Sequence, residues 1–485
     1  MRRRCPAAYG RRVSSGDRED AAVAETAAGS KTGGAGQGGI TAWPALEIAR
    51  AVREARVTPA EVVQAHLEQI GRVEPEVHAF QLVLAEQALA EAQALAGRPD
   101  LGTLALAGVP VAVKDNVDVA GAPSRHGSAA TPAQAARCDD ELVRRLRAAG
   151  CIVIGKTQMP EFAIWPFTEP AAFTATRNPW DTSRTPGGST GGGAAAVATG
   201  MAALALGSDG GGSIRIPAAC CGVVGLKPGP GIVPLAGGGA QHWHGLTAFG
   251  PLARTVGDAA AALDVLAGAD RPAVPPSQSG SLRIAYSTAP AAFGARVAPA
   301  VRAAVAAAAG ALREAGHTLV PARPPIPPTL GLRFSSRWLA GIAEDTQGLP
   351  ASAMEQRTQK MARRGQRVSR RVKPAAADPF AASAAAWISG FDALVMPTLT
   401  RPAVPIGTWA GKGWVPTMLS VGNWLCTTPW NLAGLPAISV PSTIAAGLPV
   451  GIQIIAAPGA EPVIIALAAQ LEQLRPWPHL APMAS

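Results

Sequence analysis

The sequence predicts an α/β protein built from packed layers of strands and helices. Short apolar runs typical of buried strands alternate regularly with longer runs typical of helices. Hydrophobic residues make up 48% of the 485 residues and charged residues 16%, so the chain can bury a large core. A third observation is the stretch 186–217, in which two glycine clusters bracket an uncharged run.

The expected elements follow one another along the chain. Thr58, Pro59 and Glu61 form a capping box with proline at the first helical position, so a helix should start there and run to about Arg72. The remaining patterns predict helices at 82–95, 140–149, 258–266 and 461–474, and strands at 108–113, 151–154, 223–226, 283–286, 437–440 and 451–455.

Two segments depart from this pattern. Residues 1–40 are rich in Gly, Ala, Ser and Arg without an apolar period, which predicts a disordered tail before a single domain at 41–485. Residues 321–378 form a variable basic insertion, with eight Lys and Arg but no acidic residue between 357 and 373. A helix would carry these cations as one stripe, either a solvated face, which we favour, or a contact with an anion, RNA or a partner.

Charge and cysteine content limit the setting. The formal net charge of +10 permits weak anion binding but does not establish a nucleic-acid partner. The six cysteines include no Cys-x-x-Cys, so we expect no disulfide framework and favour a cytoplasmic location. No apolar region follows the first arginines, so no secretory signal is expected. The uncharged run 191–208 is mostly Ala and Gly, which predicts a buried helix and strand rather than a membrane span.

Each glycine cluster of 186–217 carries a serine, Ser189 in the first and Ser213 in the second. Clustered glycine indicates positive φ or a close approach of the backbone to another group. Two such turns that each present a hydroxyl suggest one site built from both.

Two short motifs in the chain match known patterns in the wrong context. Residues 150–157 fit the phosphate-binding pattern G-x-x-x-x-G-K-[ST], but the four middle positions are a β-prone apolar run and not a loop. Residues 187–191 fit the nucleophile elbow G-x-S-x-G, but no apolar strand precedes them, and nothing singles out Asp392 or His479 as partners. We therefore reject both interpretations.

A serine nucleophile still needs a base. The histidines, among them His126, His242 and His244, lie outside both glycine clusters. Lys114 follows an apolar strand and stands beside Asp115, and a buried lysine can act as a base because desolvation lowers its pKa.

Several blocks together resemble the amidase signature family. They are GVPVAVKDNVDVAG (108–121), GKTQMPEFA (155–163), TRNPWDTSRTPGGSTGGG (176–193), ALGSDGGGSIRIPAACCGVVGLKP (205–228), GPLARTVGDAA (250–260), FDALVMPT (391–398) and NLAGLPAISVP (431–441). The resemblance spans about 41 to 475. It implies a large mixed twisted sheet covered by helices on both faces.

The resemblance also implies a Ser–cis-Ser–Lys triad, with Ser213 as nucleophile, Ser189 as bridging serine after a cis peptide bond and Lys114 as base. Its remaining implied roles fall to the residues around these three. They are the oxyanion donors Gly210, Gly211 and Gly212, and the supporting residues Thr190, Asp209 and Arg215. Gly210 and Thr190 differ from the family's common threonine and serine, which leaves the catalytic rate open.

The function implied is a metal-independent amidase without a cofactor. It would hydrolyse a small-molecule carboxylic acid amide through a serine acyl-enzyme. Ile164, Trp165 and Phe167 are bulky and align near the acyl pocket, so we expect a small apolar or aromatic acyl group, although plain core packing explains them equally well.

Two other functions remain open. One is the amidotransferase component of a tRNA-dependent transamidation complex, its A subunit, which the basic stripe favours and the short, divergent 321–378 region disfavours. The other is a non-catalytic binding protein on the same fold. We expect no nucleic-acid or membrane partner, and the sequence leaves a homodimer open.

Overall fold

One continuous sheet organises the protein. The computed structural model describes residues 39–239, 241–268, 280–292 and 294–484. Its 11-stranded sheet has the order β1-β3-β2-β4-β6-β5-β10-β11-β9-β7-β8 and mixes parallel with antiparallel pairs. The strands are β1 Phe80–Val83, β2 Pro110–Lys114, β3 Ile152–Thr157, β4 Leu204–Asp209, β5 Val224–Lys227, β6 Ala248–Ala253, β7 Arg283–Tyr286, β8 Thr318–Pro321, β9 Ala393–Pro397, β10 Ala437–Ala445 and β11 Leu448–Ile455.

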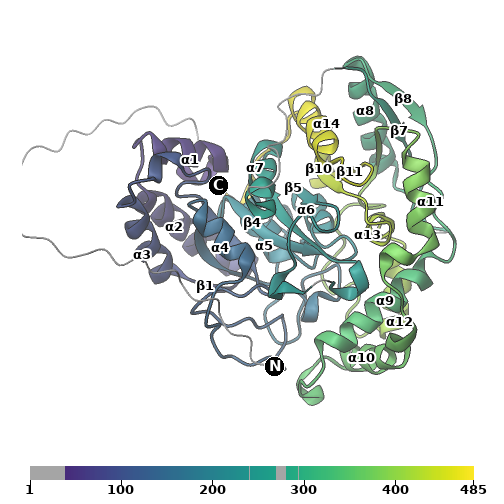
Figure 1. Ribbon diagram of the computed structural model, residues 1–485, viewed down its shortest axis with the longest axis horizontal. Helices are drawn as coiled ribbons and strands as arrows, with labels where there is room; N and C mark the ends of the chain where they lie inside the picture. The colour runs from purple at the N-terminus through teal and green to yellow at the C-terminus, as the bar shows by residue number, and fades with distance from the viewer. Residues whose placement is uncertain (1–38, 240, 269–279, 293, 485) are drawn as a thin grey trace, which may run out of the picture.

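Helices cover both faces of this sheet, which confirms the predicted fold class. They are α1 Ala45–Arg53, α2 Pro59–Val77, α3 Ala85–Ala96, α4 Glu141–Ala148, α5 Gly191–Ala198, α6 Arg215–Cys221, α7 Val256–Ala267, α8 Pro299–Glu314, α9 Leu330–Asp345, α10 Gln356–Val368, α11 Pro379–Ile388, α12 Trp414–Gly422, α13 Thr428–Leu432 and α14 Glu461–Leu474. In Figure 1, α1–α3 lie at one end of the molecule and α9–α12 toward the other.

Alternation along the strands divides the core into two layers. Val111 and Val113 of β2 pack into one cluster with α4, α7, α8 and α14, whereas Ala112 faces the other cluster with α5, α6 and α9. This period of two is the geometry of a strand buried on both faces. The central strands can therefore be apolar throughout, and polar side chains appear where the strands end.

Several elements differ from the sequence prediction. The expected helix 82–95 begins only at Ala85, because Leu82 belongs to β1 and pairs with β3. The basic helix ends at Val368, so Arg370, Arg371 and Lys373 lie beyond α10. The predicted tail falls almost entirely on residues 1–38, outside the described part of the chain. Its disorder, and the assignment of 41–485 to one domain, stay predictions.

The start of α2 matches its prediction in detail. The Thr58 side chain accepts from the backbone of Glu61, whose carboxylate in turn accepts from the Thr58 backbone N–H at 2.7 Å. No helix in the described ranges is both long and apolar enough to cross a bilayer.

Candidate active site

Three segments that are distant in sequence meet at one edge of the sheet. β2 and β4 are parallel neighbours, so their carboxyl ends, Lys114 and Asp209, emerge on the same side. Ser213 lies in the loop that follows β4 and precedes α6. Ser189 lies just before α5, the helix that leads back into β4. The Ala-rich run between the two glycine clusters is therefore a helix and a strand, as predicted.

The Lys114 ammonium group is enclosed by hydroxyls and a carbonyl. Its Nζ lies 2.7 Å from Ser189 Oγ, 2.9 Å from Ser208 Oγ and 3.3 Å from the Ser208 carbonyl oxygen. The side chain is fully buried. Burial lowers the pKa of Lys114 to about 7, against a smaller upward pull from the Asp209 charge. A substantial fraction of this lysine is thus neutral near pH 7 and can accept a proton.

Both serines line the same cavity. Its volume is about 290 Å³, and Lys114 is not among the side chains that line it. The peptide bond between Gly188 and Ser189 is cis. The Thr190 backbone N–H donates to the Ser213 carbonyl at 3.1 Å, which ties the two glycine turns together. The lysine therefore lies behind Ser189, and the hydroxyl of Ser189 stands between it and the cavity.

The loop that carries Ser213 has one backbone donor already engaged. Gly212 has φ +127°, a conformation that L side chains rarely adopt, and its N–H donates to Asp209 Oδ1 at 2.6 Å. The prediction that Gly212 supplies an oxyanion donor is therefore not supported in this conformation. No hydrogen bond from the amides of Gly210, Gly211 or Ser213 is found within the described residues.

Asp209 and Arg215 form a buried ion pair beneath this loop. Arg215 Nε lies 3.0 Å from Asp209 Oδ2, and both side chains are fully buried. Burial alone would raise the pKa of Asp209, but attraction to Arg215 and hydrogen bonds hold it well below its usual range. The hydrogen bonds that complete the network come from or go to Gly212, Ile214, Thr427, Asn431 and Gln453. The Asp209 carboxylate thus accepts from the backbone N–H groups of Gly212 and Ile214, which flank Ser213, and holds the loop in place.

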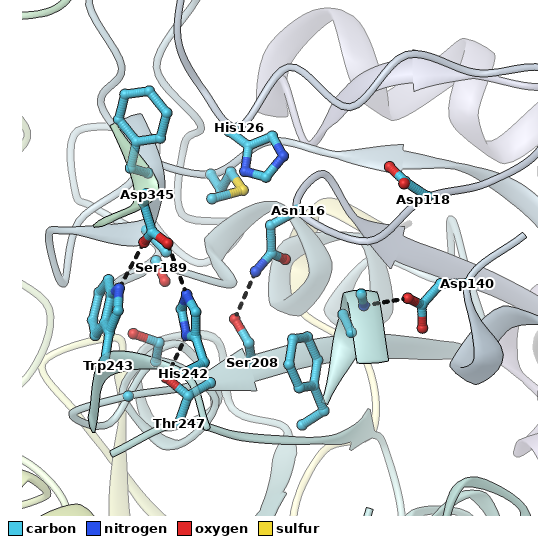
Figure 2. Close-up of a pocket in the computed structure, with 18 residues that line it drawn as sticks. Asn116, Asp118, His126, Asp140, Ser189, Ser208, His242, Trp243, Thr247 and Asp345 are labelled. Atoms are coloured by element: carbon cyan, nitrogen blue, oxygen red, sulfur yellow. Dashed lines mark hydrogen bonds and ion pairs between the residues drawn. The ribbon is translucent and has the colours of Figure 1, made fainter. Parts of the chain in front are cut away.

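Polar side chains make up much of the cavity wall (Figure 2). His242 Nε2 lies 3.1 Å from Asp345 Oδ1, and the Trp243 Nε1–H donates to Asp345 Oδ2 at 2.7 Å. The full lining is Asn116, Asp118, His126, Asp140, Met159, Phe162, Ala163, Ser189, Ser208, Gly210, Ser213, Ala236, Gly237, His242, Trp243, Thr247, Phe249 and Asp345.

Sequence reasoning missed most of this wall. Ser208 belongs to the segment 205–228 that resembles the amidase signature and is the next-to-last residue of β4, and that placement could have identified it. Asp345 and Trp243 carry no such signal, since they come from segments outside the glycine clusters and meet only in the fold.

The predicted acyl-pocket residues lie elsewhere, which corrects that assignment. Ile164, Trp165 and Phe167 do not line the cavity of the two serines. Phe162 and Ala163, which adopt positive φ, do line the cavity, but the three residues that follow them in the prediction do not. Trp165 and Phe167 stack on each other, with ring centroids 5.7 Å apart, inside the buried aromatic layer. A Cβ at Gly188 would come 2.7 Å from the Phe167 nitrogen, so this segment packs behind the Ser189 turn.

The two rejected motifs have structural explanations. Lys156 of the phosphate-loop pattern lies inside β3, is buried, and pairs with Asp115 at 3.5 Å. Asp392 accepts from the Arg283 backbone at 2.7 Å, and neither it nor His479 lines the cavity with Ser189. Within the described residues, no three His, Cys, Asp or Glu side chains cluster in a way that could hold a metal ion.

Comparison with known proteins gives consistent matches. The family model described as Amidase matches residues 61–465. AmiB2 of Mycobacterium tuberculosis (strain ATCC 25618 / H37Rv), an amidase by name, is 42% identical over 451 residues, which is 90% of this chain and 97% of that protein. The solved structure of 6-aminohexanoate cyclic dimer hydrolase complexed with substrate has a TM-score of 0.82 and 32% identity, covering 92% of this chain and 99% of that chain.

A relative with a different activity is also similar. The A subunit of the glutamyl-tRNA(Gln) amidotransferase of Symbiobacterium thermophilum is 36% identical over 464 residues, covering 85% of this chain and 92% of that protein. Its identity is lower than that of the amidase relative, so the comparisons do not favour the amidotransferase alternative.

Proposed function

This chain belongs to the amidase family, and we propose that it is a serine amidohydrolase that converts a carboxylic acid amide to a carboxylate and ammonia or an amine. The observation that carries the proposal is the Lys114–Ser189 contact of 2.7 Å behind the cavity that Ser189 and Ser213 line. A buried lysine with a pKa of about 7 is a suitable general base for a serine nucleophile.

The contacts of Lys114 suggest how its lone pair is aimed. A neutral amine has two N–H donors and one lone pair. The two oxygens of Ser208 lie within reach as acceptors, at 2.9 and 3.3 Å. The lone pair is then left for the Ser189 hydroxyl. In this arrangement Ser208 orients the base, and Ser189 is the group through which the base acts.

Acylation begins when Ser213 Oγ attacks the amide carbon. The Ser213 proton passes to Ser189 Oγ while the Ser189 proton passes to Lys114 Nζ. A C–O bond forms, and the carbonyl electrons move onto oxygen. Collapse of this intermediate breaks the C–N bond, and the proton on Lys114 returns through Ser189 to the leaving nitrogen. Water then attacks the acyl-enzyme with the same relay and releases the carboxylate.

The negative oxygen of the intermediate needs converging N–H donors. Gly210, Gly211 and Ser213 supply the amides that have no acceptor in the described contacts. Each such donor typically contributes about 3 kcal/mol of transition-state stabilisation. Asp209 and Arg215 would keep these amides in place, and Thr190 would keep the two turns in register.

The substrate is proposed to be a small-molecule amide. The cavity of about 290 Å³ has aromatic walls from Phe162, Trp243 and Phe249, which is compatible with the small apolar or aromatic acyl group expected from the sequence. The residues that support this group are not the ones the sequence suggested. The cysteine pattern supports a cytoplasmic location for the enzyme.

Hydrolysis without partners is the test of this function. The purified chain should release ammonia or amine from aliphatic, aromatic or amino-acid amides with no second protein, glutamine or tRNA present. Ser213→Ala should abolish turnover while leaving the far-ultraviolet circular dichroism unchanged. Full activity of Ser213→Ala, or a requirement for partner proteins, would contradict the proposal.

A further inference from the structure

Trp243 is wedged between two glycines, one on the loop of Ser213 and one on a helix of the variable region. A Cβ added at Gly210 would lie 2.8 Å from Trp243 Cε3 and 2.9 Å from Cζ3. A Cβ added at Gly341 of α9 would lie 2.3 Å from Trp243 Cδ1 and 2.7 Å from Cγ. Real Cβ atoms do not approach ring atoms this closely, so the indole occupies space that exists only because both positions are glycine.

The indole is held in this place by directed contacts as well. Its Nε1–H donates to Asp345 Oδ2 at 2.7 Å, and Asp345 is the last residue of α9. The His242 ring stacks on it, with centroids 5.4 Å apart and an angle of 21° between planes. His242 is itself fixed by Thr247 at 2.8 Å and by Asp345 at 3.1 Å. The ring is therefore locked to α9 and cannot easily leave the loop.

Trp243 also forms part of the substrate cavity. It lines the cavity together with Ser189, Gly210 and Ser213, and Figure 2 shows it joined to Asp345 at the side of the site. A second aromatic ring, that of Phe334 on α9, packs against the neighbouring loop residue, since a Cβ at Gly211 would lie 2.8 Å from Phe334 Cζ. Gly210 and Gly211, two of the three loop residues with candidate oxyanion donors, are thus backed by aromatic rings, one hydrogen-bonded to α9 and one carried by it.

We propose that Trp243 is a positioning and specificity-determining residue, which sets the Gly210–Gly211 backbone and limits the size of the amide substrate. The inference rests on the proposed amidase function. It explains why glycine stands at position 210, where the sequence departs from the motif it resembles. It also gives the divergent segment around α9 a role in choosing the substrate: small acyl groups fit beside the indole, and branched or bulky ones do not.

The test is a double-mutant cycle read with two active-site probes. The variants are Gly210→Ala, Trp243→Ala and the double variant, with Gly331→Ala as the matched control. Gly331 lies on α9 like Gly341, but an added Cβ there meets nothing within 4 Å. The probes are a short-chain and a bulky branched alkyl fluorophosphonate, and the readout is the rate at which Ser213 is labelled.

We expect Gly210→Ala to slow labelling by both probes about tenfold or more, because the new methyl group displaces the loop or the ring. Trp243→Ala should raise the bulky-to-short rate ratio about tenfold, the scale on which pocket size discriminates substrates. The double variant should label faster than Gly210→Ala alone, while Gly331→Ala behaves as wild type. Independent, multiplicative effects in the cycle, or an unchanged rate ratio in Trp243→Ala, would overturn the inference.

A second cycle covers the case in which Gly210→Ala does not fold. Gly341→Ala and Gly341→Ala/Trp243→Ala test the packing of Trp243 against α9. Their melting temperatures can be measured even if the variants are inactive. Trp243→Ala should recover part of the melting temperature that Gly341→Ala loses, and failure to do so would contradict the wedge. If the wild type labels with neither probe and hydrolyses no amide, the proposed function fails, while the melting temperatures still decide whether the wedge exists.

Discussion

Protonation of Lys114 should set the acid limb of the pH profile of kcat/KM. Its pKa of about 7 means that the base is mostly protonated, and inactive, below pH 7, and mostly neutral above it. Activity should therefore rise with pH, and kcat/KM should increase about tenfold between pH 6 and pH 8. Compared with an ordinary lysine, the neutral fraction at pH 7 is larger by a factor on the order of a thousand.

The assay is kcat/KM for one amide from pH 5.5 to pH 9, at constant ionic strength. Lys114→Arg keeps a charge at every pH in this range and should remove activity throughout. Lys227 is the matched control, because burial lowers its pKa to about 7 as well, but its Nζ donates to the Pro228 carbonyl oxygen at 2.9 Å and not to Ser189. Lys227→Met should keep the limb near pH 7.

Four results would contradict the assignment of this limb to Lys114. One is a profile that stays flat from pH 5.5 to pH 8.5, and another is a limb near pH 10, which would indicate an ordinary lysine. The third is loss of the limb in Lys227→Met together with its retention in Lys114→Arg. A limb that moves only in His126→Gln would assign the titration to that cavity histidine instead.

Three further predictions concern the support of the site. Gly188→Ala should lower the free energy of unfolding by about 1–3 kcal/mol in urea titration, because the new Cβ would lie 2.7 Å from backbone, whereas Gly71→Ala, on an open helix surface, should raise it by about 0.5–1 kcal/mol. Arg215→Met leaves the Asp209 carboxylate buried without its partner and should cost about 3–5 kcal/mol by the same titration; a loss under 1 kcal/mol would show that the pair is dispensable. Ser208→Ala should lower kcat about tenfold or more with little change in KM, since it removes a group that orients the buried lysine. Ser208→Thr keeps the hydroxyl and should recover much of that loss. Equal loss in both variants would contradict the orienting role.

Local patterns predicted much of the fold. The capping box at Thr58 and the apolar runs of β2, β5 and β7 depend on neighbouring residues, and their bounds came close to those of the structure. The predicted start of α3 was wrong because Leu82 fits a helical period equally well, and only its pairing with β3 makes it part of a strand. The order of the 11 strands follows from long-range pairing, which no local pattern contains.

The catalytic residues were predictable because each functional side chain lies in the same short segment as a local backbone signal. Lys114, Ser189 and Ser213 stand at a strand end and in glycine turns, and the structure brings them together at one sheet edge. The cavity walls were not predictable in this way. Asp345 and Trp243 are 102 residues apart in sequence. Trp165 is a bulky aromatic residue of the kind that lines pockets, yet it packs in the core.

The most direct test of the central claim is to identify the serine that carries the covalent adduct. The protein would be labelled with a fluorophosphonate, digested and mapped by mass spectrometry, with peptides that separate Ser189 from Ser213. We predict the adduct on Ser213, its loss in Ser213→Ala, and much slower labelling, still on Ser213, in Ser189→Ala and Lys114→Met. An adduct on Ser189 that survives Ser213→Ala would contradict the assignment of Ser213 and would identify Ser189, in the first glycine cluster, as the nucleophile.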